Sequence, residues 1–301
     1  MVMSLPDHAL SGDDPEPPDA PRSADLPRGE AVLARMRTEN FPVASRMLPQ
    51  GVREHLHALY GYFRLIDYAG DEAPGPRAEL LDLLENDLKR VYQGTARVPV
   101  LQALTPTVAE CGIPFEVLVK LIEANRRDQR VLRCETFDEL MDYCALSADP
   151  VGESVLHVFG RAEPALVAMS NRICSALQVL EHCQDIGEDL RQGRVYLPAE
   201  DLRRFGCTDE DLAADRASTR LRGLVRFEVR RARRMLDSGA PLISQLPNLG
   251  RIAVSGYVAG GRATAAAFAR ADFDPLGVDV RPSKARTFAE WARLYVLGGS
   301  R

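Results

Sequence analysis

The sequence lacks the cysteine and histidine spacings that mark disulfide frameworks and most nitrogen- or sulfur-ligated metal sites. Its six cysteines contain no C-x-x-C pair and lie mostly in apolar helical contexts. This excludes a zinc site built on cysteine pairs and indicates reduced thiols, as in a cytosolic protein. The five histidines form no H-E-x-x-H motif, and the one H-x-H pair, His55 and His57, has no cysteine or further histidine nearby in the sequence, so a histidine-built metal site is not indicated either.

Strong net charge and long apolar runs are also missing. A net charge of −5 over 301 residues provides no general basic field, which argues against a nucleic-acid partner. No run approaches the roughly 18 uncharged apolar residues of a membrane span. The best candidate, residues 252–269, is interrupted by Arg262 and is rich in Gly and Ala, which is typical of tight helix packing in a core.

The first 27 residues lack the apolar region of a signal peptide and carry six prolines and six acidic residues. Such a composition cannot bury enough apolar surface to fold, so residues 1–27 are predicted to form a disordered tail. A cytoplasmic location is expected, and peripheral contact with the inner face of a membrane stays open.

Alternating strand patterns are absent from residue 28 onward, where the apolar periodicity is helical nearly everywhere. With no interior linker and no repeat, residues 28–301 are predicted to form one all-α domain. Prolines 99, 114 and 164 suit first helical turns, and Thr136-x-x-Glu139 looks like a capping box. Other helices are expected at about residues 30–37, 52–72, 77–92, 218–236, 252–270 and 281–295, and a long central helix runs from Pro164 through Asp189.

The acidic residues of that central helix form one row. Glu181, Asp185, Glu188 and Asp189 fall at i, i+4, i+7 and i+8, so they share a face of a segment that is otherwise apolar. Burying unpaired anions is very costly, so such a row needs a counter-charge. A divalent cation with oxygen ligands meets that need, and Mg²⁺ also implies phosphate.

A second acidic pair, Asp67 and Asp71, is spaced i,i+4 near the end of the helix expected at 52–72. Two interior helices that each carry such a pair could hold Mg²⁺ between them, with a diphosphate filling the open coordination positions. The alternative is that the D-x-x-x-D spacing is common on solvated helices. The occurrence of two matching pairs favours the metal–diphosphate interpretation.

Two arginines and three tyrosines accompany these acids. Arg64 precedes Asp67 by one turn, and Arg194 lies where the second acidic helix is expected to end. Both suit the anchoring of diphosphate oxygens, although Arg64 could instead pair with the acids themselves. Aromatic rings could line an apolar cavity and stabilise a carbocation, or could simply belong to the core. The tyrosines considered for this role are Tyr60, Tyr143 and Tyr196.

Arginine is concentrated in the helix expected at 218–236. A solvated helix face that pairs with neighbouring acids is the preferred interpretation, and attraction to an anionic membrane surface is the alternative. The residues are Arg220, Arg222, Arg226, Arg230, Arg231, Arg233 and Arg234.

Both acidic segments resemble the signature regions of the squalene/phytoene synthase family. The segments are YGYFRLIDYAGDE (Tyr60–Glu72) and LQVLEHCQDIGEDLRQGRVYLP (Leu177–Pro198). The family has aspartates at i and i+4 in its first motif and D-x-x-E-D followed by a G-R-x-Y-x-P-like segment in its second. Because both occur in order on a helical chain of suitable length, the resemblance implies a class I isoprenoid synthase, a helical bundle around a deep apolar cavity.

Within the family, three stretches resemble the bacterial hydroxysqualene synthase branch of hopanoid pathways. These are Glu39–Pro49, Ser147–Gly160 and the second signature. The resemblance implies Mg²⁺-dependent conversion of presqualene diphosphate into hydroxysqualene through ionisation, rearrangement and water capture. It also implies functional coupling to a presqualene diphosphate synthase and to a separate squalene-forming oxidoreductase. No nicotinamide is expected, in agreement with the absence of a Gly-rich dinucleotide loop.

The family's motifs carry over residue by residue. The four motif aspartates would bind metal, with Glu188 as the acid inside the second motif, and Arg64, Arg194 and Tyr196 would lie at the diphosphate. Tyr60 and Tyr143 would line the cavity. Tyr68 stands where many relatives have a second consecutive aspartate, and Glu181 stands where phytoene- and dehydrosqualene-type enzymes carry asparagine. The resulting metal set is Asp67, Asp71, Glu181, Asp185, Glu188 and Asp189.

Two other functions are compatible with the sequence. One is a head-to-head prenyl transferase that condenses two farnesyl or two geranylgeranyl diphosphates in the same fold. The other is a non-catalytic helical assembly factor, suggested by the missing acid at Tyr68, although the intact aspartates argue against it.

Overall fold

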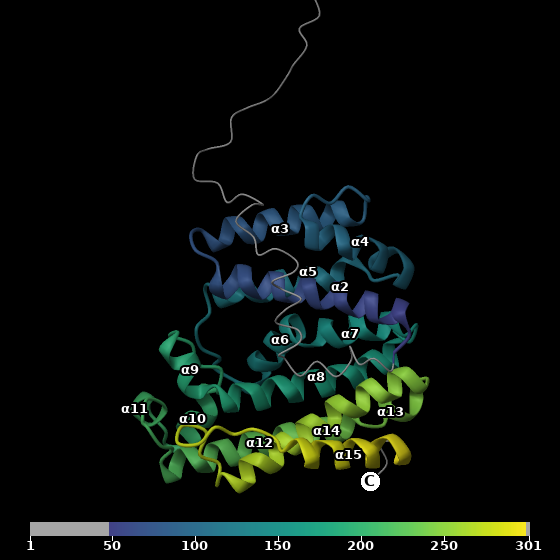
Figure 1. Cartoon of the computed structure of the whole chain (residues 1–301). Helices are drawn as coiled ribbons and strands as arrows, with labels where there is room; N and C mark the ends of the chain where they lie inside the picture. Colours follow the sequence, from purple (N-terminus) through teal and green to yellow (C-terminus); the bar gives the residue numbers. More distant parts are fainter. Residues whose placement is uncertain (1–47, 299–301) are drawn as a thin grey trace, which may run out of the picture.

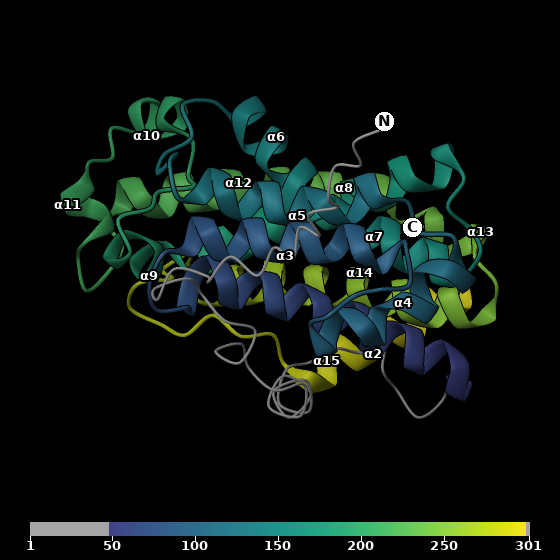
Figure 2. The same cartoon turned by 90° about the horizontal axis from the view of Figure 1, so that it is seen from above.

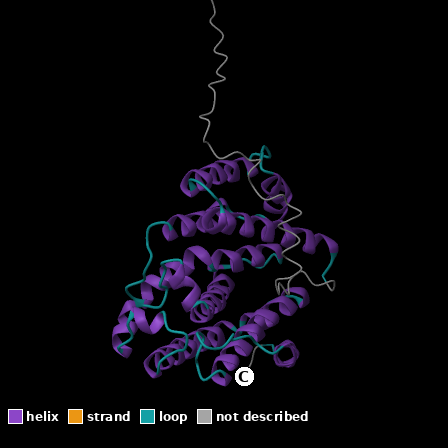
Figure 3. Cartoon of the chain, turned by 60° about the vertical axis from the view of Figure 1, so that its left-hand side comes forward, coloured by secondary structure: helices purple, strands orange, loops and turns teal. Residues whose placement is uncertain are grey.

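The computed structural model describes residues 48–298, and each regular element within that range is a helix (Figures 1 and 3). One isolated bridge joins Arg133 to Val195. The helices are α2 (Gln50–Asp67), the π-helix η3 (Tyr68–Glu72), α3 (Arg77–Val91), α4 (Pro99–Cys111), α5 (Phe115–Asp128), α6 (Phe137–Ser147), α7 (Asp149–Val158), α8 (Pro164–Gln184), α9 (Ile186–Arg191), α10 (Ala199–Phe205), α11 (Asp209–Leu212), α12 (Thr219–Gly239), α13 (Leu242–Gln245), α14 (Asn248–Arg270) and α15 (Lys284–Leu297).

The helices are stacked in layers around α8. In Figure 1, α3 and α4 lie above α2 and α5, and α7 and α8 lie below them. Helix α8 packs along α12, which contacts α14, and α15 lies against α14 at the lower edge. Figure 2 shows the same arrangement from above, with α9, α10 and α11 at one end. The prediction of an all-α fold is confirmed over this range, and the tail at 1–27 and the helix at 30–37 lie outside it.

Helix starts lie close to where the sequence signals place them. Pro99 and Pro164 occupy first turns, where their missing N–H groups cost nothing. Thr136 caps α6, because its hydroxyl accepts from the N–H of Glu139 at 3.2 Å. Ser218 caps α12 by accepting from Leu221 at 3.3 Å.

The helix predicted over 52–72 changes type at its functional end. Helix α2 ends at Asp67 and continues as η3, whose wider turn is closed by a 2.8 Å bond from Ala73 N–H to the carbonyl of Tyr68. Gly70 permits this turn to lie against α5: a Cβ there would come 1.7 Å from Asn125 Oδ1. Gln129 also donates to the carbonyl of Gly70 at 3.0 Å. Single π turns of this kind are frequent at functional sites.

The central helix is also interrupted, which corrects the prediction of one continuous acidic row. Asp185 has φ −98° and ψ 13°, so α8 ends at Gln184 and α9 begins at Ile186. Gly187, a weak helix former, follows two residues later. The acids of the second signature therefore lie on two helix segments, and Asp185 lies at the junction.

The arginines of α12 pair with acids, as the preferred interpretation predicted. Arg222 contacts Asp272 at 2.5 Å and Asp274 at 2.8 Å, and Arg231 contacts Asp201 at 2.9 Å. Arg226 and Arg233 also form ion pairs, with Asp272 and Asp237.

Candidate active site

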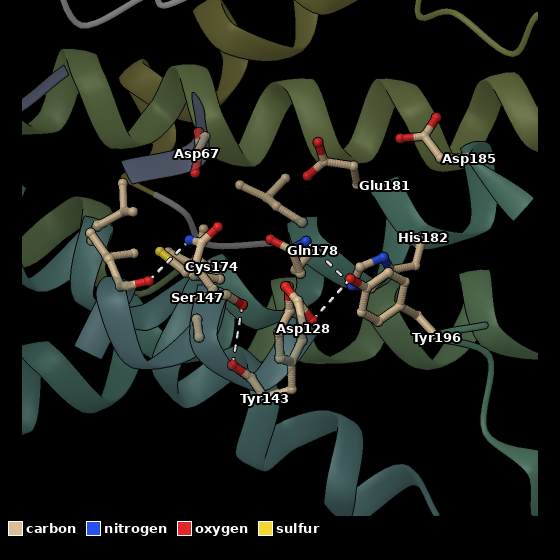
Figure 4. A pocket seen from close by; sticks show the side chains of 18 of the residues that line it. Asp67, Asp128, Tyr143, Ser147, Cys174, Gln178, Glu181, His182, Asp185 and Tyr196 are labelled. Atoms are coloured by element: carbon tan, nitrogen blue, oxygen red, sulfur yellow. Dashed lines mark hydrogen bonds between the residues drawn. The ribbon is translucent and has the colours of Figure 1, made fainter. Parts of the chain in front are cut away.

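A cavity of about 520 Å³ lies between the helices that carry the two acidic segments (Figure 4). Along α8 its lining changes from Ile173 and Leu177 to Glu181 and then Asp185 at the helix end. From Ile173 to Asp185 the rise is about 18 Å at 1.5 Å per residue, enough for a long substrate. One part of the cavity is acidic, and the other is lined by apolar residues that include Leu121, Val155, Leu156, Leu242 and Val254.

The α2–η3 wall contributes Arg64, Asp67 and Asp71 to the lining. Arg64 lies 3.6 Å from Asp67 and 3.3 Å from Glu72. It therefore pairs with acids of its own segment, which was the alternative considered from the sequence. These side chains are only partly buried, so the pairs contribute modestly to stability and can exchange for a ligand.

The α8–α9 wall contributes Glu181, Asp185, Glu188 and Asp189. Burial raises the pKa of Asp185 to about 6, with further contributions from Glu181, Asp189 and Glu188. Burial and the charge of Asp189 likewise raise the pKa of Glu181. Within residues 48–298 neither carboxylate forms a hydrogen bond or an ion pair with a cationic side chain, so the wall has an excess of negative charge.

Arg194 joins the two walls. Its guanidinium lies 2.8 Å from Asp71 on η3, and its backbone N–H bonds the carbonyl of Asp189 at 2.9 Å. Burial alone would lower the pKa of Arg194, but the hydrogen bond and charge of Asp71 raise it overall. A permanent cation therefore lies at the acidic part of the cavity.

Two of the predicted tyrosines donate hydrogen bonds to one buried carboxylate. The sequence analysis did not identify this carboxylate. Asp128, the last residue of α5, accepts from Tyr143 at 2.7 Å and from Tyr196 at 3.1 Å, and the two rings stack with centroids 5.2 Å apart. Burial raises the pKa of Asp128, opposed by these hydrogen bonds and the charge of Arg194. A carboxylate at a helix C-terminus opposes the helix dipole, a signal that could have indicated its special role.

His182 and Gln178 extend this polar cluster along α8. The His182 ring stacks on Tyr196 with centroids 3.9 Å apart, and Nδ1 lies 3.8 Å from Asp189 Oδ2. Gln178 Nε2 lies 3.3 Å from His182 Nε2. Both residues line the cavity, and their side chains connect the tyrosines to the acidic α8–α9 wall.

The structure brings together every predicted site residue except one. Tyr60 is buried in α2 and is not among the described residues that line the cavity. Tyr143 and Tyr196 do line it, as do all six predicted metal-binding acids and both predicted arginines.

The donor chemistry of the site suits hard divalent cations. Within residues 48–298, no three carboxylate, histidine or cysteine side chains form a preformed metal cluster. The acids instead lie on two walls of one cavity. Oxygen-only donors of this kind fit Mg²⁺, which keeps few protein ligands and completes its shell with phosphate oxygens and water.

An all-helical single domain around a cavity with an acidic mouth and apolar walls is the isoprenoid synthase fold. The family model for squalene/phytoene synthase matches residues 34–287, and the chain belongs to this family. It is therefore an enzyme with the prenyl-transferase-type fold of this family.

Named relatives and solved structures agree with this assignment. The chain is 35% identical to a hydroxysqualene synthase of Sinorhizobium fredii, over 73% of this chain and 74% of the relative. It is 33% identical to a phytoene synthase of Arthrospira platensis, over 65% of this chain and 68% of the relative. The crystal structure of squalene synthase HpnC from Alicyclobacillus acidocaldarius superposes with a TM-score of 0.76 at 39% identity, covering 83% of this chain and 98% of that one. A dehydrosqualene synthase, 22% identical with a TM-score of 0.80 over 89% of this chain and 95% of that one, shares the fold.

Proposed function

We propose that this enzyme is a hydroxysqualene synthase that converts presqualene diphosphate and water into hydroxysqualene and diphosphate. The observation that carries the proposal is the combination of the two-walled acidic site with 31–35% identity to relatives named hydroxysqualene synthase. The length of the cavity along α8 accommodates a long prenyl chain beyond the diphosphate site.

In the proposed reaction the carbon–oxygen bond to the diphosphate breaks, and its electron pair leaves with the diphosphate. Arg64 and Arg194 donate hydrogen bonds to the departing oxygens. Mg²⁺ bound by Asp67, Asp71, Glu181, Asp185, Glu188 and Asp189 would supply Lewis-acid assistance to this departure.

The cation that remains rearranges within the apolar walls, where bulk water is excluded. Tyr143 and Tyr196 line the cavity, where their aromatic rings and hydroxyl dipoles can stabilise positive charge. Water then adds its oxygen to the rearranged cation and loses a proton, which gives the hydroxyl group of the product.

The test is to incubate the purified enzyme and Mg²⁺ with presqualene diphosphate, and separately with farnesyl diphosphate, and to identify the extracted lipids. Hydroxysqualene from presqualene diphosphate supports the proposal. Formation of presqualene diphosphate from farnesyl diphosphate, with no hydroxysqualene from presqualene diphosphate, would overturn it.

A head-to-head condensation is the second candidate, favoured by the 33% identity to a phytoene synthase. The same experiment extended to geranylgeranyl diphosphate distinguishes it, because phytoene would then accumulate. Under the leading proposal, a presqualene diphosphate synthase must supply the substrate and a squalene-forming oxidoreductase must consume the product.

A further inference from the structure

The C-terminal helix α15 has two apolar sides, of which only one is covered. On the inner side, Leu294 is 1% exposed and Trp291 Nε1 donates to the carbonyl of Ile252 on α14 at 3.1 Å. Glu290, the one acid in Lys284–Leu297, is also held on this side by Arg262 at 2.7 Å. The packing of α15 on α14 therefore uses the inner side and neutralises the helix's acid there.

The outer side of α15 is an apolar stripe. Ala285, Phe288, Ala289, Ala292 and Val296 are spaced by one, three or four residues and share one face of the helix. Phe288 is 66% exposed and Val296 is 75% exposed, the two highest values among the exposed large apolar residues of the described chain. Figure 1 shows this helix at the outer edge of the molecule, beyond α14.

Aromatic and basic side chains flank the stripe. Along one flank, Trp291 stacks on Tyr295 with centroids 5.8 Å apart, and its ring is tilted against Phe288 with centroids 5.5 Å apart. Exposed Lys284 and Arg286 lie at the start of the helix. Arg293 lies about two to two and a half turns further on, and is exposed although it contacts Glu290 at 3.5 Å. A helix that lies in a membrane interface typically combines an apolar face with flanking aromatic and basic side chains, and α15 has all three.

From this arrangement we infer that α15 is a membrane-docking helix that binds the surface of anionic lipid bilayers. The stripe provides the apolar face, and the three cations complement lipid phosphate and acidic headgroups. No helix within residues 48–298 is long and apolar enough to cross a membrane, so the contact is peripheral. The proposed lipid-binding surface is not on the arginine-rich helix α12, whose arginines pair largely with acids.

The docking helix is close to the apolar part of the cavity. Val254 and Tyr257 of α14 line the cavity, whereas Ile252 of the same helix receives Trp291. One helix therefore separates the proposed lipid contact from the apolar cavity wall. The inference does not depend on which prenyl diphosphate is the substrate, so it can fail or hold independently of the proposed function.

Trp291 is the only tryptophan in the sequence, and it lies on this helix. Intrinsic fluorescence of the full-length protein therefore reports directly on α15. The experiment mixes the protein with vesicles of phosphatidylcholine alone or of phosphatidylcholine with phosphatidylglycerol, and measures co-sedimentation and the emission of Trp291. We expect binding and a blue shift with the anionic vesicles, and quenching when brominated lipids are included.

Variants separate the apolar and the basic contributions. Phe288→Ser with Val296→Ser is expected to weaken vesicle binding roughly tenfold or more, because both side chains lose their apolar contact. Lys284→Gln and Arg286→Gln are each expected to weaken binding to anionic vesicles roughly fivefold. The matched control is Val131→Ser with Leu132→Ser, which removes two exposed apolar side chains elsewhere and should leave binding unchanged.

Three results would overturn the inference. The full-length protein could fail to bind anionic vesicles, with no shift in the emission of Trp291. The protein could sediment as a dimer that Phe288→Ser with Val296→Ser converts to a monomer, which would assign the stripe to a second copy. The control variant could lose binding as strongly as the α15 variants, which would place the lipid contact elsewhere.

Discussion

The hydroxyl of Tyr143 donates a 2.7 Å hydrogen bond to the buried carboxylate of Asp128. Because Tyr196 donates to the same carboxylate at 3.1 Å, one carboxylate fixes the orientation of two rings that line the cavity. Asp128 thus acts through the tyrosines, as a positioning residue.

Asp128→Asn is expected to lower kcat by roughly tenfold to a hundredfold, the range for hydrogen bonds to a charged group. The variant should retain its unfolding temperature, because it also removes a charge that burial disfavours. Steady-state kinetics and thermal unfolding check both expectations. If Asp128→Asn and Tyr143→Phe have independent, additive effects on kcat, the carboxylate does not act through Tyr143.

The metal set is tested by single carboxylate substitutions. Asp67→Asn and Asp185→Asn, one on each wall, are each expected to lower kcat/KM at least about a hundredfold, because each removes charge that holds cations against the diphosphate. Chelation of divalent cations should abolish turnover, and added Mg²⁺ should restore it. Asp215→Asn, which changes an exposed acid outside the cavity, is the matched control. Wild-type activity in either wall variant would contradict the assignment.

The π turn depends on the missing side chain at Gly70. Gly70→Ala is expected to destabilise the protein by about 1–3 kcal/mol, because the added methyl group would collide with Asn125. The displaced turn carries Asp71, so activity should fall as well. Gly260→Ala is the control: nothing lies within 4 Å of its Cβ position, and stability should rise by up to about 1 kcal/mol. Asn125→Ala should rescue Gly70→Ala, and a lack of rescue would show that the strain has another source.

A buried acid away from the metal set gives a pH prediction. Burial raises the pKa of Asp149 from 3.8 to about 6, although Ser175 donates a 2.8 Å hydrogen bond to it. A raised pKa in the folded state means that the contribution of Asp149 to stability is full below about pH 3.8 and is lost as the pH rises through about 6.

Asp149→Asn keeps an acceptor for Ser175 and removes the charge. It should therefore stabilise the protein above about pH 6, by at most about 3 kcal/mol, and lose this advantage under acidic conditions. Thermal unfolding of both proteins across the pH range measures the difference. A difference that is constant with pH would show that the titration of Asp149 is not its cause.

The sequence was sufficient to predict the fold class, most helix bounds and the two acidic walls. Periodicity and spacing report which residues share a face, so Asp67, Asp71 and the second signature could be paired before any coordinates were known. Asp128 and His182 were missed because their roles come from contacts between distant segments: Asp128 meets Tyr196 across 68 positions of sequence.

The two departures from regular helix could not be predicted from the sequence patterns either. Both the π turn at η3 and the break at Asp185 occur within segments of uninterrupted helical periodicity. The π turn lies where Gly70 meets Asn125 on α5, a contact that no local pattern encodes. Tyr60 is likewise buried without lining the cavity, and which face of α2 meets the cavity depends on contacts with other helices.

The break at Asp185 has a consequence for local stability. It leaves Glu188 and Asp189 on α9, a helix of six residues, far below the roughly 12–15 at which an isolated helix becomes even marginally stable. The helix is ordered by its neighbours, and mutual repulsion of the acids works against it. The acidic wall should therefore open by local unfolding more often than the bundle does, and backbone hydrogen exchange in α9 should slow sharply when cations and diphosphate are added. If this slowing is observed, one wall of the site completes its folding when the ligands bind.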